Sequence, residues 1–205
     1  SISKIRRSGL IVMNLKENDE LVSVHPLRAD DDVMMVSEMG QSIRFQCSEV
    51  TPHSRTAGGI IGMRLNPGDK IMAMDVVVPD GYLLVVSKHG YGKVTAFARY
   101  KTQKRAGKGI KTLNITKKTG LVADAVVSAK PDQEIFLVSQ KAQVFRTSIQ
   151  EIPPRGRNTQ GVILWKPGSS DSVASVELVD QSRLLTFSAS KQDDQAAQNE
   201  SQPTE

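Results

Sequence analysis

A repeat of about 50 residues runs through this chain. Gly9, Gly59, Gly109 and Gly161 each open an apolar run, and successive copies are 50, 50 and 52 residues apart. Two further markers recur with nearly the same spacing. One is a serine at the end of an apolar run, and the other is a separate apolar run. These markers are Ser37, Ser87 and Ser139, and residues 21–24, 71–74, 121–124 and 173–176. Repeats of this size indicate one supersecondary unit that is stacked or arranged around an axis.

The unit is built from short strands. Within one repeat, turn residues such as Pro79-Asp80-Gly81 separate runs that are rich in β-branched and apolar side chains. The predicted strands are residues 70–78, 82–87, 93–98 and 110–115. No segment before the carboxy-terminal tail sustains helical spacing. The sequence therefore predicts an all-β, propeller-like fold with four-stranded blades.

Three complete repeats lie between Gly9 and Gly161, with partial repeats on each side. We therefore expect a partial set of blades, in one domain over residues 1–188. Residues 189–205 contain Asp193, Asp194, Glu200 and Glu205 but no large apolar residue, which predicts a disordered polar and acidic tail. The lone Cys47 is typical of a reducing cytoplasm, and no apolar run is long enough to span a membrane.

The charge of the chain is unevenly distributed. The net charge is +5, yet no acidic residue occurs between Asp80 and Asp124, and that stretch contains ten lysines and arginines. Ordinary surfaces intersperse charges of both signs. A block of one sign indicates a polyanionic partner, with nucleic acid first and an acidic membrane second, although a merely solvated basic face is the simpler alternative.

The connection before each repeated glycine is basic as well as glycine-rich. The three copies are residues 54–59, 103–109 and 156–161. Arginine and lysine suit a phosphate backbone, and glycine allows backbone N–H groups to approach phosphate oxygens. A tight corner that needs glycine for its geometry would give the same pattern in one copy. Three copies in equivalent places favour phosphate contacts.

Catalytic patterns are missing from the sequence. His25, His53 and His89 are scattered without cysteine or carboxylate neighbours at metal-ligand spacing, and no phosphate-binding loop of ATPases occurs. Tyr100 follows an arginine, as in type II topoisomerase cleavage centres, but it lies within a repeat and we expect no catalytic role. The aromatic residues Phe97, Phe145 and Trp165 are expected to pack in the core rather than to stack on bases.

Several segments resemble the carboxy-terminal domain of the DNA gyrase A family. Residues 145–152 and 156–164 are similar to its last repeat, residues 89–93 to the repeat before it, and residues 14–21 to an earlier one. Residues 103–109 match five of seven positions of the family's Gln-Arg-Arg-Gly-Gly-Lys-Gly box. Their order along the chain indicates a degenerate copy, so the true box of the first blade is expected upstream of Ser1.

The resemblance implies a β-pinwheel, a propeller-like disc whose blades exchange strands and whose basic rim wraps duplex DNA for negative supercoiling. It implies a non-catalytic part of an ATP-dependent enzyme, with ATP and Mg²⁺ bound only elsewhere in the holoenzyme. The implied partners are duplex DNA, the rest of the gyrase A protein and the gyrase B protein, at a cytoplasmic, nucleoid-associated location and without a membrane.

Charge and position together predict the residues of the DNA-binding rim. They are Arg55, Lys88, Lys93, Arg99, Lys101, Lys104, Arg105, Lys108, Lys111, Arg146, Arg155 and Arg157. Two alternatives remain open, the equivalent carboxy-terminal domain of topoisomerase IV and a propeller-like module that binds an acidic protein.

Overall fold

The computed structural model describes residues 11–54 and 57–179 of the 205-residue chain. The predicted tail, the ends of the predicted domain and Arg55 lie outside the described residues. The described strands are β1 (Asp32–Ser37), β2 (Gln41–Gln46), β3 (Ile71–Val76), β4 (Tyr82–Ser87), β5 (Tyr91–Ala96), β6 (Ile110–Lys111), β7 (Val122–Ser128), β8 (Glu134–Ser139), β9 (Val144–Ser148), β10 (Val162–Ile163) and β11 (Val173–Val179). Three short 3-10 helices follow the hairpins, η1 (Cys47–Glu49), η2 (Phe97–Arg99) and η3 (Ile149–Glu151). No helix in the described part is long and apolar enough to cross a membrane.

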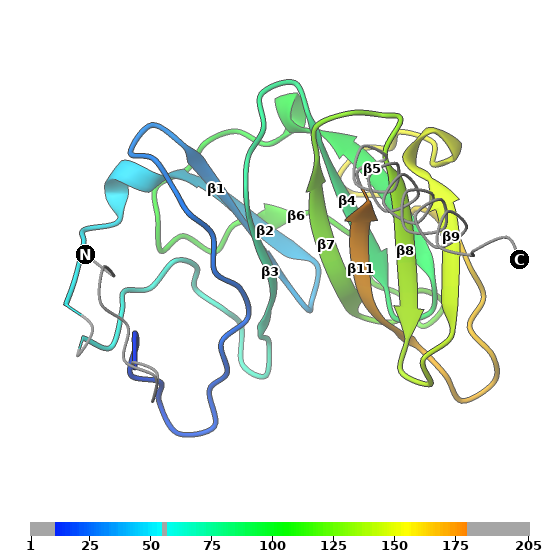
Figure 1. The fold of residues 1–205 in the computed structure, drawn as a ribbon, viewed down its shortest axis with the longest axis horizontal. Helices are drawn as coiled ribbons and strands as arrows, with labels where there is room; N and C mark the ends of the chain where they lie inside the picture. The colour runs from blue at the N-terminus through cyan, green and yellow to red at the C-terminus, as the bar shows by residue number, and fades with distance from the viewer. Residues whose placement is uncertain (1–10, 55–56, 180–205) are drawn as a thin grey trace, which may run out of the picture.

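The strands form three antiparallel sheets, which follow one another across Figure 1. Their strand orders are β3-β1-β2-β6, β7-β4-β5-β10 and β11-β8-β9. Each sheet is a hairpin flanked by an inner strand, and β3, β7 and β11 contact one another in sequence. The short outer strands β6 and β10 come from the connection that leaves the following blade. The chain therefore exchanges strands between neighbouring blades, and the all-β, pinwheel-like prediction is confirmed.

The repeated serine shapes each hairpin turn. The hydroxyl oxygens of Ser37, Ser87 and Ser139 accept hydrogen bonds from backbone N–H groups four residues later, at 3.3, 3.2 and 3.1 Å. All three serines are buried. A side-chain acceptor in this position satisfies a donor that the tight turn would leave unpaired, which explains why the marker recurs with the hairpin.

The middle blade is buried on both faces because it lies between the other two. Leu83 and Val85 of β4 pack in the core shared with the first blade, together with Met34 and Val36. Leu84 and Val86 point to the opposite face, into the core shared with the third blade. Alternate residues of a strand face opposite sides of a sheet, so a strand between two blades must be apolar throughout.

Some predicted strands are shorter or displaced. β5 begins at Tyr91 rather than residue 93, because the turn occupies only residues 88–90. The predicted strand 110–115 ends at Lys111, since the N–H groups of Thr112 and Leu113 both donate to the Gly40 carbonyl oxygen and turn the chain.

The amino-terminal copies of the repeat do not form strands. Residues 21–24 and 60–61 match positions in β3 and β6, but they lie outside any sheet. No hairpin is available to pair with them among the described residues. Their apolar side chains consequently stay exposed, with Leu21 at 55%, Val24 at 73% and Ile61 at 61% of full exposure.

Carboxylates on the inner strands connect one blade to the next. Asp75 Oδ2 on β3 accepts a hydrogen bond from the Val127 N–H on β7 at 3.0 Å, and Asp124 Oδ2 accepts one from the Val176 N–H at 2.9 Å. Burial raises the pKa of Asp124 to about 6, opposed by the hydrogen bonds from the backbone N–H groups of Val176 and Ala125 and increased further by Glu177 and Asp75. Below about pH 6 the folded chain therefore favours the neutral acid.

Asp124 should make the protein less stable as the pH rises through 6. The folded state holds a proton that the unfolded state loses near pH 3.8, so between these values the unfolding free energy falls with pH. The group's contribution is about 2 kcal/mol after allowing for solvent screening. We expect the stability difference between Asp124→Asn and the wild type to change by this amount between pH 4 and pH 7 in urea unfolding. Asp80→Asn, on an exposed turn, is the control, and a constant difference for Asp124→Asn would contradict the prediction.

Candidate nucleic-acid interface

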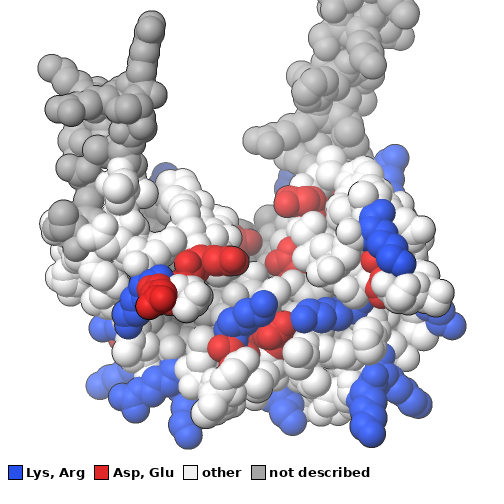
Figure 2. All heavy atoms as spheres, turned by 90° about the horizontal axis from the view of Figure 1, so that it is seen from below, with Lys and Arg blue, Asp and Glu red and all other residues white. Residues whose placement is uncertain are grey.

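Six exposed cations lie on the connections that carry strands from blade to blade. Residues 99–111 run from β5 to the outer edge of the first sheet, and residues 149–163 run from β9 to the outer edge of the second. Exposed side chains on these connections are those of Arg99, Lys101, Lys104, Lys108, Lys111 and Arg155. On the face shown in Figure 2, lysines and arginines line the lower margin, whereas acidic side chains lie nearer the middle.

The loop at 103–109 presents two of its three cations to solvent. Arg105 is committed to the protein: its backbone N–H donates to Glu49 Oε2 at 3.0 Å, Nε donates to the Glu49 carbonyl oxygen at 3.2 Å, and Nη1 donates to the Ile61 carbonyl oxygen. Lys104 and Lys108 flank it and are exposed. Arg105 therefore fixes the loop to the rest of the protein, and only Lys104 and Lys108 expose their positive charge to solvent.

The loop at 156–161 occupies the same place on the second blade. Arg157 is half-buried, and its Nη1 donates to the Lys111 carbonyl oxygen at 3.1 Å, which connects the outer edges of the two blades. The Arg155 N–H donates to the Val94 carbonyl oxygen, leaving its side chain exposed. An open pocket of about 750 Å³ lies between this loop and the segment after β5, with Arg99, Lys101 and Arg157 in its lining.

Three residues predicted for the rim make polar contacts within the protein. Lys93 is fully buried, and its ammonium contacts only oxygens of the loop at 156–159. Lys88 Nζ lies 2.6 Å from Glu38 Oε1 of the preceding blade, and this carboxylate side chain is only 10% exposed. Arg146 pairs with Glu134 in the third blade, although its side chain is 56% exposed. Sequence charge alone did not reveal these partners.

The repeated glycines are explained by backbone geometry. Gly109 and Gly161 have φ angles of +72° and +79°, where other residues are strained. A Cβ on Gly109 would lie 2.8 Å from the Ser42 carbonyl carbon, and one on Gly161 would lie 2.8 Å from the Gly92 carbonyl carbon. The glycine lets the outer strand approach the hairpin of the neighbouring blade. The backbone geometry thus requires glycine at these two positions whether or not a phosphate is bound.

The aromatic residues for which the sequence predicted no site role lie in the core or pack against it. Tyr100 is buried, and its hydroxyl lies 2.7 Å from Thr112 Oγ1. Phe145 and Trp165 stack with their ring centroids 5.9 Å apart. The described residues contain no group of three histidine, cysteine or acidic side chains arranged to hold a metal ion.

Residues that the charge pattern missed become evident when the repeats are aligned. Arg64 and Lys166 each lie five residues after a repeated glycine, Gly59 and Gly161, and both are exposed.

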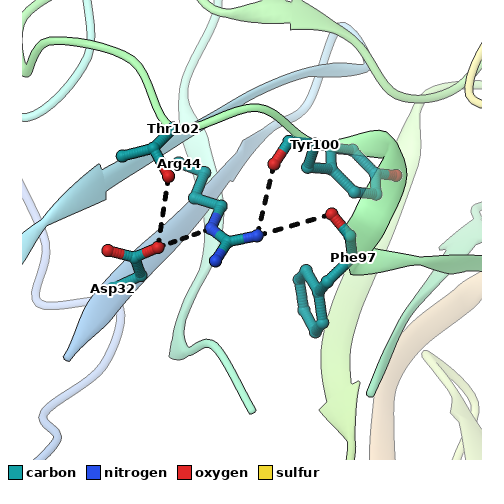
Figure 3. A network of polar contacts seen from close by, with 5 residues as sticks. All are labelled: Asp32, Arg44, Phe97, Tyr100 and Thr102. Carbon is teal, nitrogen blue, oxygen red and sulfur yellow. Dashed lines mark hydrogen bonds and ion pairs between the residues drawn. The ribbon is translucent and has the colours of Figure 1, made fainter. Parts of the chain in front are cut away.

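An ion pair also recurs in two of the blades. The pairs Asp32–Arg44 and Glu134–Arg146 share a spacing of 12 residues, and both form ion pairs. In Figure 3 the Arg44 guanidinium also reaches the carbonyl oxygens of Phe97 and Tyr100 in the next blade.

Known proteins share both the sequence pattern and the fold of this chain. The family described as the DNA gyrase C-terminal domain, beta-propeller, matches residues 1–28, 31–77, 81–129 and 133–180, which are four successive repeats. The DNA gyrase A protein of Escherichia coli (strain K12) is 36% identical over 201 residues, 95% of this chain and 23% of that protein. The DNA gyrase A protein of Mycolicibacterium smegmatis is 36% identical over 173 residues, 83% of this chain and 20% of that protein.

Solved structures agree with these sequence matches. A DNA gyrase A C-terminal domain superposes with a TM-score of 0.79 at 30% identity, over 84% of this chain and 59% of that one. The C-terminal domain of a DNA topoisomerase IV superposes with a TM-score of 0.82 at 25% identity, over 87% of this chain and 56% of that one. The chain spans about a fifth of the gyrase A sequences that it matches. By its repeats, its strand exchange and these matches, the chain belongs to the DNA gyrase C-terminal domain family of β-propellers.

Proposed function

We propose that this chain binds and wraps duplex DNA along its basic rim, as the C-terminal domain of a DNA gyrase A protein. The observation that carries the proposal is the set of exposed cations on the outer connections of two adjacent blades. The first of these connections, residues 99–111, lies within a stretch from 81 to 123 that has no acidic residue. Lysine and arginine side chains there can neutralise phosphates without reading base edges. The chain itself supplies no catalytic group in this proposal.

Membership of the family supports a proposal for the wider assembly. The domain would act in a type IIA topoisomerase with the rest of the gyrase A protein and with the gyrase B protein, in the cytoplasm and on the nucleoid, where ATP and Mg²⁺ belong to other parts of the enzyme. The superposition on a topoisomerase IV domain supports a second candidate, the same DNA contact in that enzyme. The identity of 36% to gyrase A proteins favours gyrase.

The proposal revises the expected contact residues. Lys104, Lys108, Arg99, Lys101, Lys111, Arg155 and Arg157 remain as contacts, and Arg64 and Lys166 join them because they are exposed at equivalent outer positions. Four predicted residues are excluded as primary phosphate contacts because their charged groups already bind protein oxygens. They are Lys88, Lys93, Arg105 and Arg146.

DNA binding should depend steeply on salt and little on sequence. If about six phosphates are neutralised, the logarithm of the binding constant should fall against the logarithm of salt concentration with a slope near −5. The double variant Lys104→Ala/Lys108→Ala should make the slope shallower by about 2, because it removes two exposed contacts. Fluorescence anisotropy with labelled duplexes of two unrelated sequences measures both slopes.

The exposed Lys130→Ala, on the β7–β8 turn, is the matched control for loss of charge, and it should leave the slope unchanged. An acidic polypeptide of equal charge tests the protein-binding alternative. Binding of the polypeptide as tightly as DNA, or an affinity for DNA that does not respond to salt, would overturn the proposed function.

A further inference from the structure

Lys93 is a buried cation whose hydrogen bonds all go to one loop. Its side chain has no exposed surface. Nζ donates to the carbonyl oxygens of Gly156 and Arg157, each at 2.6 Å, and to Thr159 Oγ1 at 3.2 Å. These acceptors belong to the connection that comes from the third blade, whereas Lys93 lies on β5 of the second. The ammonium therefore fixes a loop from beneath, across a blade boundary.

The blade does not need a lysine at this position. Lys93 pairs with Val85 in the second blade as Ile43 pairs with Met35 in the first and Phe145 with Leu137 in the third. Ile43 is fully buried, and Gly107 of the equivalent loop lies directly above its side chain. An apolar side chain thus supports the same loop in the first blade. Burial of an ammonium is costly without a carboxylate partner, and Lys93 makes no ion pair among the described residues.

The other side of this loop faces a pocket lined with donors. Arg99, Lys101 and Gln103 lie on one wall, and Arg157, Asn158 and Thr159 lie on the other, with no acidic residue in the lining. The side-chain amide nitrogen of Gln103 is buried and has no acceptor among the described residues. A buried donor without a partner normally finds one, and because Gln103 lines the pocket, a movement of its side chain would bring this donor to an anionic oxygen there.

We propose that this pocket seats a phosphate group of the DNA backbone, and that Lys93 is a positioning residue that holds the loop at 156–159 so that Arg157 faces it. Two arginines and a lysine supply charge, and Gln103, which also lines the pocket, carries a side-chain donor without a partner among the described residues. Lys93 adds a positive charge directly behind the loop without contacting the ligand. The inference rests on the proposed DNA binding. It assigns part of the DNA affinity to the pocket beside residues 156–159, and none to the equivalent loop of the first blade, which is supported by Ile43.

The site also couples DNA binding to a proton. Burial first and the nearby Arg157 second lower the pKa of Lys93 to about 8. Tyr100, beside the same arginine, has a pKa raised by burial and stays neutral in this range. A phosphate would offset the repulsion between Lys93 and Arg157 and favour the charged lysine. Affinity should therefore fall as the pH rises through 8, because binding then requires proton uptake.

The test replaces Lys93 with the residue that the first blade uses. Lys93→Ile in the full chain should lower the affinity for a mixed-sequence duplex about ten-fold at pH 7, while its urea unfolding midpoint stays equal or rises. Arg157→Ala should lower the affinity similarly, and the double variant should lose little more, since both act on one pocket. The wild type should lose affinity about five-fold between pH 7.5 and 9, and Lys93→Ile should not.

The outcomes separate this inference from the proposed function. A wild type that fails to bind DNA defeats both. A wild type that binds with the steep salt dependence, while Lys93→Ile and Arg157→Ala bind equally well, defeats the inference alone. If Lys93→Ile does not fold, Arg157→Ala and Arg99→Ala, on opposite walls, test whether the pocket contributes to DNA affinity. The pH profile of DNA binding by the wild type then tests the role of Lys93. Lys130→Ala is again the charge control and should retain the wild-type pH profile.

Discussion

Gly161→Ala should lower the free energy of unfolding by about 3 kcal/mol. The backbone at Gly161 has a φ of +79°, which costs an alanine about 1 kcal/mol or more. A Cβ there would also lie 2.8 Å from the Gly92 carbonyl carbon, and closer still to its oxygen, where β10 meets β5. Backbone atoms on both sides must move to relieve this contact. Urea unfolding followed by the fluorescence of Trp165, the single tryptophan of the chain, measures the loss.

The same loop provides the control for Gly161. A Cβ on Gly156 would meet nothing within 4 Å, and Gly156 does not have a positive φ. Gly156→Ala should be neutral or stabilising by up to about 1 kcal/mol, because it restricts the unfolded chain. Gly109→Ala should repeat the large loss in the first blade, where the carbonyl of Ser42 blocks the Cβ. Equal stability of the alanine variants at 156 and 161 would show that the outer strand can shift without cost.

The architecture was largely predictable because certain residues recur wherever the backbone needs the same local geometry. The glycines recur where an outer strand passes close to a neighbouring hairpin, and the serines recur where a hairpin turns. Exchange of strands between blades came only from the family resemblance, since β6 and β10 are two residues long and leave almost no pattern of their own. The apolar run at residues 21–24 corresponds to β3 but forms no strand, because no hairpin among the described residues can pair with it.

The contact residues were harder to predict because charge does not indicate where a side chain points. Lys93 belonged to the acid-free stretch, yet its repeat equivalents Ile43 and Phe145 are apolar, so alignment of the repeats would have indicated a buried position. Lys88 occupies the position of Glu38 in the preceding repeat, and the two pair across the blade boundary. In a repeat protein, exceptional residues at a repeated position are therefore more informative than local charge.

Arg44 couples the first two blades, and its loss should be among the most damaging single substitutions. Its Nε lies 2.6 Å from Asp32 Oδ2 within the first blade, and Nη1 donates to the carbonyl oxygens of Phe97 and Tyr100 in the second, at 3.4 and 3.3 Å (Figure 3). Asp32 is only 15% exposed, so it would keep just the Thr102 hydroxyl, at 3.3 Å, as a partner. The pair is only partly buried, but removal of the arginine still leaves the Asp32 carboxylate without its charged partner.

Arg44→Met should therefore cost about 3 kcal/mol in urea unfolding, and Asp32→Asn in the same chain should restore part of that loss, because the orphaned charge is then gone. The third blade supplies the matched control. Arg146 occupies the position of Arg44 and pairs with Glu134, but it is largely exposed and has no hydrogen bond to a following blade among the described residues. Arg146→Met should consequently be far milder. If the two methionine variants lose the same stability, the carbonyl contacts across the blade boundary contribute nothing, and the blades are held together by their apolar cores alone.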